Sequence, residues 1–301
     1  MSGAALRGWA AVTAAILLCG GVAGCESDPP SILSDSTEVG TKDDQPGTSF
    51  SPHGGQFIGF DVSVVGTLMN NLGYKTPRFT SVMSQDRIRV LHEGGVQLVA
   101  ATFSITPDRM APEGTSPQAG DLDFVGPYAT TQQGFLIRKK DAAKFRKKRD
   151  FDGEIVCVWA GTTSANQLSK GGFEKIVPTM EDDAKTCVKR LEAGTVAAVS
   201  TDVLILYGLT QEHHGLEVVP GLEFGEAPNQ YGIAMTKGHR KDCVRLRDEL
   251  LKYIGNATTW ETNFKSSLPA VPKAIRDEAR PREEDVMDLS CVDKPGNGSS
   301  D

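Results

Sequence analysis

Segments with the pattern of a β-strand alternate with helix-like segments in the first part of this 301-residue chain. A strand is predicted near Val39. Residues 59–73 form a predicted helix, because apolar side chains recur every three or four positions before a glycine that suits a C-cap. Residues 76–84 and 98–101 are predicted strands on either side of a helix over residues 85–95. This alternation predicts an α/β sheet, which binds ligands at the carboxyl ends of its strands.

The loop after the strand at residues 98–101 has the composition of an anion-binding site. Thr102 and Ser104 supply hydroxyl groups, and Pro107 opens a helix with Arg109 in its first turn. Backbone N–H groups at a helix start attract anions, and a planar guanidinium can bind a carboxylate through two parallel hydrogen bonds. The segment predicts a carboxylate receptor, although an arginine in a first turn is more often an exposed surface residue.

Residues 1–24 have the features of a bacterial signal peptide. Arg7 precedes an apolar segment, residues 9–18, that is too short to span a bilayer as a helix. The sequence VAGC ending at Cys25 resembles a lipobox, so we expect cleavage before Cys25 and attachment of a lipid to it. The alternative is a secreted protein with an incidental Gly-Cys pair. Residues 25–38 are rich in Ser, Asp and Pro and predict a flexible tether.

Charge and motifs exclude several classes of function. The formal net charge of −7 argues against a nucleic-acid partner. The sequence has no G-x-S-x-G or H-E-x-x-H motif and no P-loop. His213 and His214 form an isolated pair, which indicates a surface loop rather than a metal site. We therefore expect no metal and no cofactor.

Six runs resemble, in order, the polar amino-acid-binding proteins of ABC importers, which are family 3 of the bacterial extracellular solute-binding proteins. The runs are GTKDDQPG (residues 40–47), GFDVSVVGTLMNNLG (59–73), SITPDR (104–109), DFVGPY with GFLIRK (123–128 and 134–139), GTTSANQL (161–168) and STDVLILYG (200–208). The first run resembles the glutamate-binding branch of the family. The resemblance implies a two-lobed α/β fold of the type II periplasmic-binding-protein class, with each lobe an α/β sandwich.

The resemblance also implies how the chain is divided. We predict that residues 39–133 and 226–271 form lobe one and that residues 134–225 form lobe two. The chain would then cross between the lobes twice, and two crossing segments form a hinge that lets the lobes close on a ligand. Residues 272–301 are charged, contain proline and predict a partly ordered C-terminal tail.

Four cysteines remain once the signal peptide and the lipid site are set aside. An even number of cysteines in an oxidising compartment favours disulfides, and their spacing does not match a zinc site. Of three possible connectivities we favour Cys157–Cys187 within lobe two and Cys243–Cys291, which would join the tail to lobe one.

Positions that match the family's motifs imply a ligand site. Arg109, with N–H groups near Ser104 and Thr162, is expected to bind the carboxylate of a free amino acid. Asp202 is expected to bind the ammonium group together with Thr102. From local sequence alone Asp202 is better explained as the N-cap of the following helix, and the matching runs favour the ligand-binding role.

The residues around the ligand's side chain are less closely specified. Lys42 could receive a second carboxylate, which favours glutamate or aspartate, or it could be a solvated lysine at a strand end. Asp43 and Asp44 beside it could instead favour a basic or amide side chain. Trp159 is a candidate for the pocket wall.

The resulting hypothesis is a lipid-anchored binding protein on the outer face of the cytoplasmic membrane. It would capture a polar amino acid, glutamate or aspartate in the first instance, and deliver it to an ABC permease and ATPase complex. We expect no enzymatic activity. Two alternatives remain: a periplasmic dehydratase on the same fold, and a ligand-sensing lipoprotein that presents its closed form to a membrane signalling partner.

Overall fold

The computed structural model describes Met1 and residues 29–116 and 119–292. Of these, residues 31–116 and 119–292 belong to one compact unit. Apart from Met1, the expected signal peptide lies outside the described residues, as does the expected lipid site at Cys25. Within the described ranges, no helix is long and apolar enough to cross a membrane.

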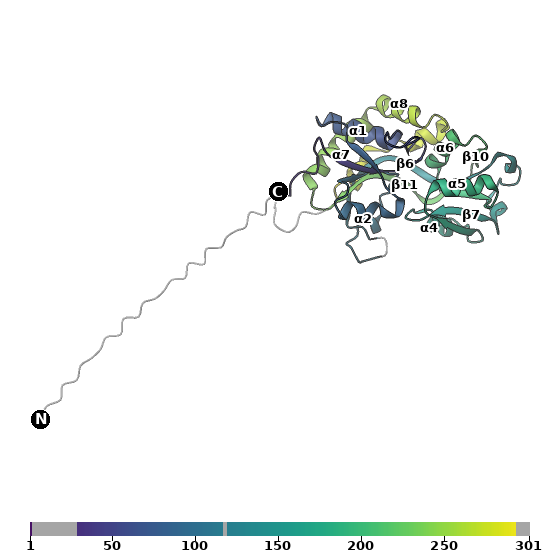
Figure 1. Ribbon diagram of the computed structural model, residues 1–301, viewed down its shortest axis with the longest axis horizontal. Coiled ribbons are helices and arrows are strands. Elements are labelled where there is room, and N and C mark those ends of the chain that lie inside the picture. Colours follow the sequence, from purple (N-terminus) through teal and green to yellow (C-terminus); the bar gives the residue numbers. More distant parts are fainter. Residues whose placement is uncertain (2–28, 117–118, 293–301) are drawn as a thin grey trace. The chain divides into compact units, whose positions relative to one another are not determined.

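Strands and helices alternate along this unit (Figure 1). The strands are β1 (Glu38–Thr41), β2 (Asp44–Gln45), β3 (Ser49–Phe50), β4 (Arg78–Ser81), β5 (Leu98–Val99), β6 (Leu122–Arg138), β7 (Ile155–Trp159), β8 (Val177–Glu181), β9 (Ala198–Asp202), β10 (Leu216–Val218) and β11 (Phe224–Thr236). The α-helices are α1 (Phe60–Asn71), α2 (Arg87–His92), α3 (Pro107–Met110), α4 (Ser164–Lys170), α5 (Ala184–Ala193), α6 (Val203–Glu212), α7 (Arg240–Gly255), α8 (Ala257–Ser267), α9 (Lys273–Ala279) and α10 (Glu283–Leu289). Short 3-10 segments are η1 (Ser84–Asp86), η2 (Lys139–Asp141) and η3 (Lys148–Phe151).

A nine-stranded mixed sheet runs through the unit. The strand order is β4-β1-β5-β11-β6-β9-β7-β8, and β10 pairs with β6. Parallel pairing occurs in two separate groups, β4-β1-β5 and β9-β7-β8, while β6 and β11 are antiparallel to each other. Parallel strands need crossover connections, so each parallel group brings its own helices, and the two groups form the centres of two lobes.

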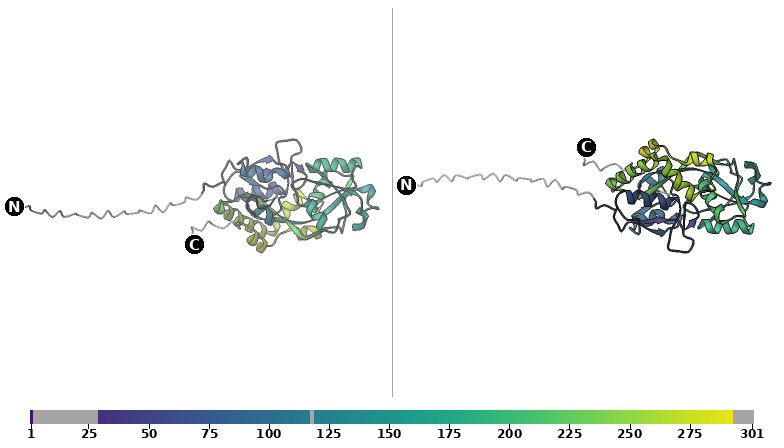
Figure 2. Two further views of the ribbon diagram at one scale, coloured as in Figure 1. Left: turned by 90° about the horizontal axis from the view of Figure 1, so that it is seen from below. Right: turned by 90° about the horizontal axis from the view of Figure 1, so that it is seen from above.

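Two long strands connect these lobes. β6 has 17 residues and β11 has 13, and each belongs to both halves of the sheet. Figures 1 and 2 show α1, α2 and α7 on one side of this strand pair and α4, α5 and β7 on the other. We name the side with β1 to β5, α1 to α3 and α7 to α10 lobe one, and the side with β7 to β10 and α4 to α6 lobe two. The predicted two-lobed α/β fold is confirmed.

Each lobe has its own hydrophobic core. In lobe one, Phe60 of α1 packs against Trp260 and Phe264 of α8 with ring centroids 5.5 and 5.2 Å away, and all three side chains are at most 1% exposed. In lobe two, one face of the sheet packs against α5, and the other buries a cluster of phenylalanines that includes Phe135. Separate cores joined by two strands allow the lobes to move as units.

The N-terminal end of the unit corrects one prediction. Residues 25–38 were expected to be a flexible tether, but Ser31 Oγ donates to Asp242 Oδ1 at 2.7 Å, and the N–H of Ile32 donates to Asp242 Oδ2 at 2.8 Å. Leu33 is only 3% exposed and belongs to the core of lobe one. From Ser31 onward the segment is therefore part of the fold.

The predicted C-terminal tail, expected to be partly ordered, contains two helices within residues 272–292. α9 and α10 pack on lobe one, where Ala279, Val286 and Cys291 are each at most 4% exposed and join its core. Four of the seven residues in each helix are charged, so the sequence resembles a solvated tail although Ala279 and Val286 are buried.

Both predicted disulfides are present. Cys157 bonds to Cys187 with a Cα–Cα distance of 5.6 Å, and Cys243 bonds to Cys291 with a Cα–Cα distance of 5.7 Å. The first links β7 to α5 inside lobe two. The second holds the segment after α10 on α7 of lobe one.

Candidate functional site

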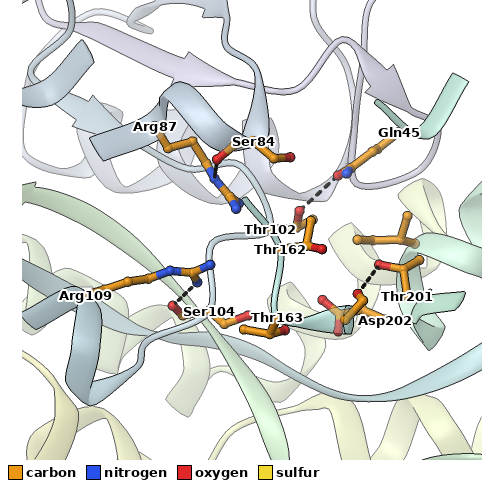
Figure 3. Close-up of a pocket in the computed structure, with 12 residues that line it drawn as sticks. Gln45, Ser84, Arg87, Thr102, Ser104, Arg109, Thr162, Thr163, Thr201 and Asp202 are labelled. Carbon is orange, nitrogen blue, oxygen red and sulfur yellow. Dashed lines mark hydrogen bonds between the residues drawn. The ribbon is translucent and has the colours of Figure 1, made fainter. Parts of the chain in front are cut away.

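A polar cavity lies between the lobes at the carboxyl ends of their strands (Figure 3). Its empty volume is about 260 Å³, part of which is open solvent. Ile205 is the one apolar side chain among the residues that line it. The lining residues are Gln45, Ser84, Arg87, Thr102, Ser104, Arg109, Thr162, Thr163, Ser164, Thr201, Asp202 and Ile205.

Arg109 lines this cavity, as predicted from the sequence. Thr106 is the N-cap of α3 and accepts the N–H of Arg109 at 3.3 Å, which fixes the first turn. The guanidinium is buried, donates to the carbonyl oxygens of Ser104 (2.5 Å) and Gly161 (3.2 Å), and lies 4.3 Å from the ring centroid of Phe103. Burial and a second nearby arginine hold its pKa well below the ordinary value.

That second arginine is Arg87, which the sequence analysis did not identify as a site residue. It is 2% exposed, and its guanidinium donates to the carbonyl oxygens of Ser84 (2.9 Å), Ala101 (2.9 Å) and Gly161 (2.7 Å). Burial lowers its pKa to about 10, against the opposing effect of nearby acidic groups, so it stays charged near neutral pH. One signal was available, because Arg87 lies four positions before Leu91 and so shares its buried helix face.

Asp202 supplies the negative charge of the cavity. Its carboxylate accepts from the side-chain amides of Gln133 and Asn229 and from the hydroxyl of Tyr231 at 2.8 Å. Burial raises its pKa to about 6, while the hydrogen bonds from Tyr231 and Asn229 and the charges of the two arginines act in the opposite direction. Asp202 occupies the N-cap position of α6 but makes no capping hydrogen bond. The capping explanation for its side chain is therefore wrong.

Thr102 adopts a left-handed backbone conformation at φ 48°, and hydrogen bonds on the side away from the cavity stabilise it there. Asp61 of α1 accepts the N–H of Thr102 at 2.8 Å and the hydroxyl of Tyr128 at 2.9 Å. Asp61 is buried, and burial raises its pKa to about 7. The Thr102 hydroxyl also donates to the side chain of Gln45 at 2.9 Å. Asp61 thus positions the loop without lining the cavity.

Lobe two contributes the turn that carries Gly161 and Thr162. Gly161 has φ 76°, and an added Cβ would come within 2.4 Å of the backbone nitrogen of Gln85 in lobe one. Only glycine allows the lobes to approach this closely here. Thr162 lines the cavity beside it, and its hydroxyl donates to the carbonyl of Trp159 at 2.7 Å.

Two predicted site residues lie elsewhere. Trp159, expected at the pocket wall, is 1% exposed and belongs to the core of lobe two beside the Cys157–Cys187 disulfide. Lys42, expected to receive a second carboxylate, is also 1% exposed, and its ammonium group lies 3.4 Å from Asp44 and 3.2 Å from the carbonyl of Val82. Neither is among the lining residues, because both side chains turn into packed protein.

Charge is unevenly distributed around the cavity. In Figure 3 the guanidinium groups of Arg87 and Arg109 point toward its middle from one side, and Asp202 lies on the other. Two cations and one anion can receive a small molecule with two anionic groups and one cationic group. No cluster of three metal-ligating side chains occurs in the ranges that the structure covers, and His213 pairs with Glu192 at 2.8 Å.

Comparison with known sequences gives consistent results. The profile of the family described as bacterial extracellular solute-binding proteins, family 3, matches residues 37–266. The glutamate-binding protein GluB of Corynebacterium efficiens is 30% identical over 244 residues, which are 76% of this chain and 78% of that protein. GluB of Corynebacterium glutamicum is 29% identical and covers 85% of this chain and 86% of its own length.

Solved structures share the fold. The solute receptor for L-cysteine of Neisseria gonorrhoeae has a TM-score of 0.69 at 19% identity and covers 82% of this chain and 96% of its own. An ancestral amino acid-binding protein, AncCDT-1, described as a precursor of cyclohexadienyl dehydratase, has a TM-score of 0.66 at 24% identity and covers 78% and 96%. At these identities the likeness establishes the fold alone.

Proposed function

Because the chain belongs to the bacterial extracellular solute-binding proteins of family 3, we propose that it captures glutamate or aspartate between its lobes and delivers it to an ABC transporter. Amino-acid binding and the link to ABC transport follow from the family. The acidic ligand is the finer step, and the two relatives named glutamate-binding protein support it.

One observation carries the acidic ligand: the charges of the cavity match it. Arg87, Arg109 and Asp202 are each at most 4% exposed. Glutamate and aspartate carry two carboxylates and one ammonium group, so every ligand charge can meet an opposite one. A neutral amino acid would leave one buried guanidinium without an anion, and an unpaired buried charge costs about 3 to 5 kcal/mol.

The roles follow from position. Arg109 and the N–H groups around Ser104 and Thr162 would bind the α-carboxylate, and Asp202 with Thr102 would bind the ammonium group. Arg87 would bind the distal carboxylate, a role that the sequence suggested for Lys42. A guanidinium has five N–H donors, and the described contacts of Arg87 and Arg109 use three and two of them.

Location and partners complete the proposal. The signal peptide and a lipid on Cys25 would hold the protein outside the cytoplasm, on the membrane that contains its permease and ATPase complex. Loss of the protein from the membrane fraction on Cys25→Ala, with the wild type retained there, tests the lipid anchor. An unchanged distribution would remove it.

Calorimetric titration tests the ligand. Residues 26–301, stripped of bound ligand by unfolding and refolding, should bind glutamate or aspartate one to one and glutamine more weakly. If none of the common amino acids bound, the amino-acid site would be rejected. Equal affinities for glutamate and glutamine would reject the argument that the two arginines select a second carboxylate.

Arg87→Gln tests the distal contact. It should weaken glutamate binding by about 2 kcal/mol or more, the cost of truncating one partner of a buried charge pair, and should reduce the preference for glutamate over glutamine. Arg89→Gln is the matched control, because Arg89 belongs to the same helix and is 55% exposed. Wild-type glutamate affinity in Arg87→Gln would place the distal carboxylate elsewhere.

A further inference from the structure

The lobes also contact each other outside the cavity. Asp44 of β2, in lobe one, accepts the backbone N–H of Ala184, the first residue of α5 in lobe two, at 3.0 Å. Neither residue lines the cavity. The lobes are therefore joined at a place that a ligand in the cavity would not touch.

The chemistry of this contact favours the closed arrangement. The first N–H groups of a helix have no partner within the helix, and the helix dipole adds partial positive charge there. A carboxylate from the facing lobe accepts a hydrogen bond from one of these N–H groups and also offsets the partial positive charge. Asp183, the N-cap of α5, accepts the N–H of Thr186 at 2.7 Å, so Asp44 and Asp183 serve different donors of the same helix end.

Lys42 completes the contact from within lobe one. Its ammonium group lies 3.4 Å from Asp44 Oδ1, and the two side chains are only 1% and 7% exposed. Among the residues that the structure describes, Asp44 Oδ1 has no hydrogen-bond partner, so the adjacent cation compensates its charge. A buried carboxylate without such a cation would be costly, and Lys42 therefore offsets that cost at the interface.

We propose that Lys42 and Asp44 form a clasp that sets ligand affinity from outside the cavity by stabilising the closed lobes. Arg87 and Arg109 also reach lobe two, through the carbonyl of Gly161, but these are groups assigned above to the ligand. The clasp shares no atom with the ligand site. It rests on the proposed function in one respect: closure must accompany ligand binding.

If both ligands require the same closure of the lobes, weakening the clasp should change their dissociation constants by the same factor. Asp44→Asn keeps the side-chain shape and removes the charge. The variant should raise the dissociation constants of glutamate and aspartate by the same factor, about tenfold, the change that corresponds to about 1.4 kcal/mol. The increase should appear mainly in the dissociation rate. Asp43→Asn is the matched control, because Asp43 is exposed and adjacent, and it should bind as the wild type does.

Ala184→Pro tests the contact from the other lobe and covers the case in which Asp44→Asn does not fold. Proline is well tolerated at the first position of a helix and lacks the N–H. The preceding residue, Asp183, already has the extended conformation that proline requires, at φ −148° and ψ 167°. This variant should weaken both ligands at least as much as Asp44→Asn while leaving the Lys42–Asp44 pair in place.

Small-angle scattering of the free protein supplies a readout that does not depend on the ligand. Asp44→Asn should increase the radius of gyration, and Asp43→Asn should not. If the wild type bound no amino acid, the proposed function would fail, while scattering would still test the clasp. Unchanged affinity and unchanged scattering in both clasp variants would overturn it. A changed ratio between the two ligands would also overturn it, because that places Asp44 in the ligand site.

Discussion

Replacing Asp202 with asparagine should change ligand affinity and protein stability in opposite directions. In the wild type, Oδ1 accepts from Gln133 and Asn229 and Oδ2 accepts from Tyr231. An asparagine can keep its carbonyl oxygen toward the two amides and donate its NH₂ to the Tyr231 hydroxyl, which is able to accept. The substitution therefore removes the charge and keeps the three contacts, with the Tyr231 hydroxyl accepting instead of donating.

The effect on stability follows from the pKa of Asp202. Burial raises this pKa from 3.8 to about 6 in the folded protein. Above pH 6 the carboxylate is ionised in the folded and unfolded states, and the folded state bears a cost of about 3 kcal/mol from the difference in pKa. Below pH 3.8 both states are protonated, and the cost is absent. Asp202→Asn should therefore stabilise the ligand-free protein by up to about 3 kcal/mol at pH 7.5, and by little at pH 3.5.

The effect on binding has the opposite sign. The ammonium group of the ligand would lose its one charged partner among the lining residues, which should weaken binding by about 2 to 5 kcal/mol. Urea unfolding at both pH values measures stability, and calorimetry measures affinity. Asp182→Asn, which removes an exposed charge, is the control and should alter neither quantity. A variant less stable than the wild type at pH 7.5, or one that binds glutamate normally, would refute the reasoning.

Two further predictions follow from the packing. Gly161→Ala should lower ligand affinity at least tenfold with little loss of secondary structure, because the new Cβ would lie 2.4 Å from the backbone of Gln85 and hold the lobes apart; calorimetry with circular dichroism checks this, and normal affinity would show that the lobes need not approach so closely. Replacing Cys157 and Cys187 by alanine should lower the free energy of unfolding by about 3 to 4 kcal/mol in the chain-entropy model, as measured by urea titration, and an unchanged midpoint would contradict that figure.

Local sequence patterns were sufficient for much of the fold. The helix expected over residues 59–73 is α1 (Phe60–Asn71), and the loop and helix start that carry Arg109 lie where the apolar strand before them predicts. Family motifs placed Asp202 in the cavity against a reasonable capping alternative. These features are encoded within a few neighbouring residues, so the sequence reveals them directly.

Other site features depend on contacts between distant segments. Lys42 lies in the segment expected to contact the ligand, but its direction is set by Asp44 and by Val82, 40 positions away. Arg87 was overlooked because a charged residue on a helix is usually exposed. Its spacing from Leu91 is a weak local sign of burial, whereas its contacts with Phe103 and the Gly161 turn involve distant segments. The packing of the tail depends in the same way on distant segments, since Ala279 and Val286 are buried in the core of lobe one.

Adjacent residues of α7 hold the two ends of the folded unit. Asp242 binds the segment at Ser31, and Cys243 binds the segment at Cys291. Lobe two is therefore an insertion within lobe one, and the described chain neither enters nor leaves through it. A solid support or a dye attached at either end of the folded unit would move together with lobe one. A fluorescence sensor built on this protein therefore needs its second dye on an internal position of lobe two, because a pair at the two ends would not register closure.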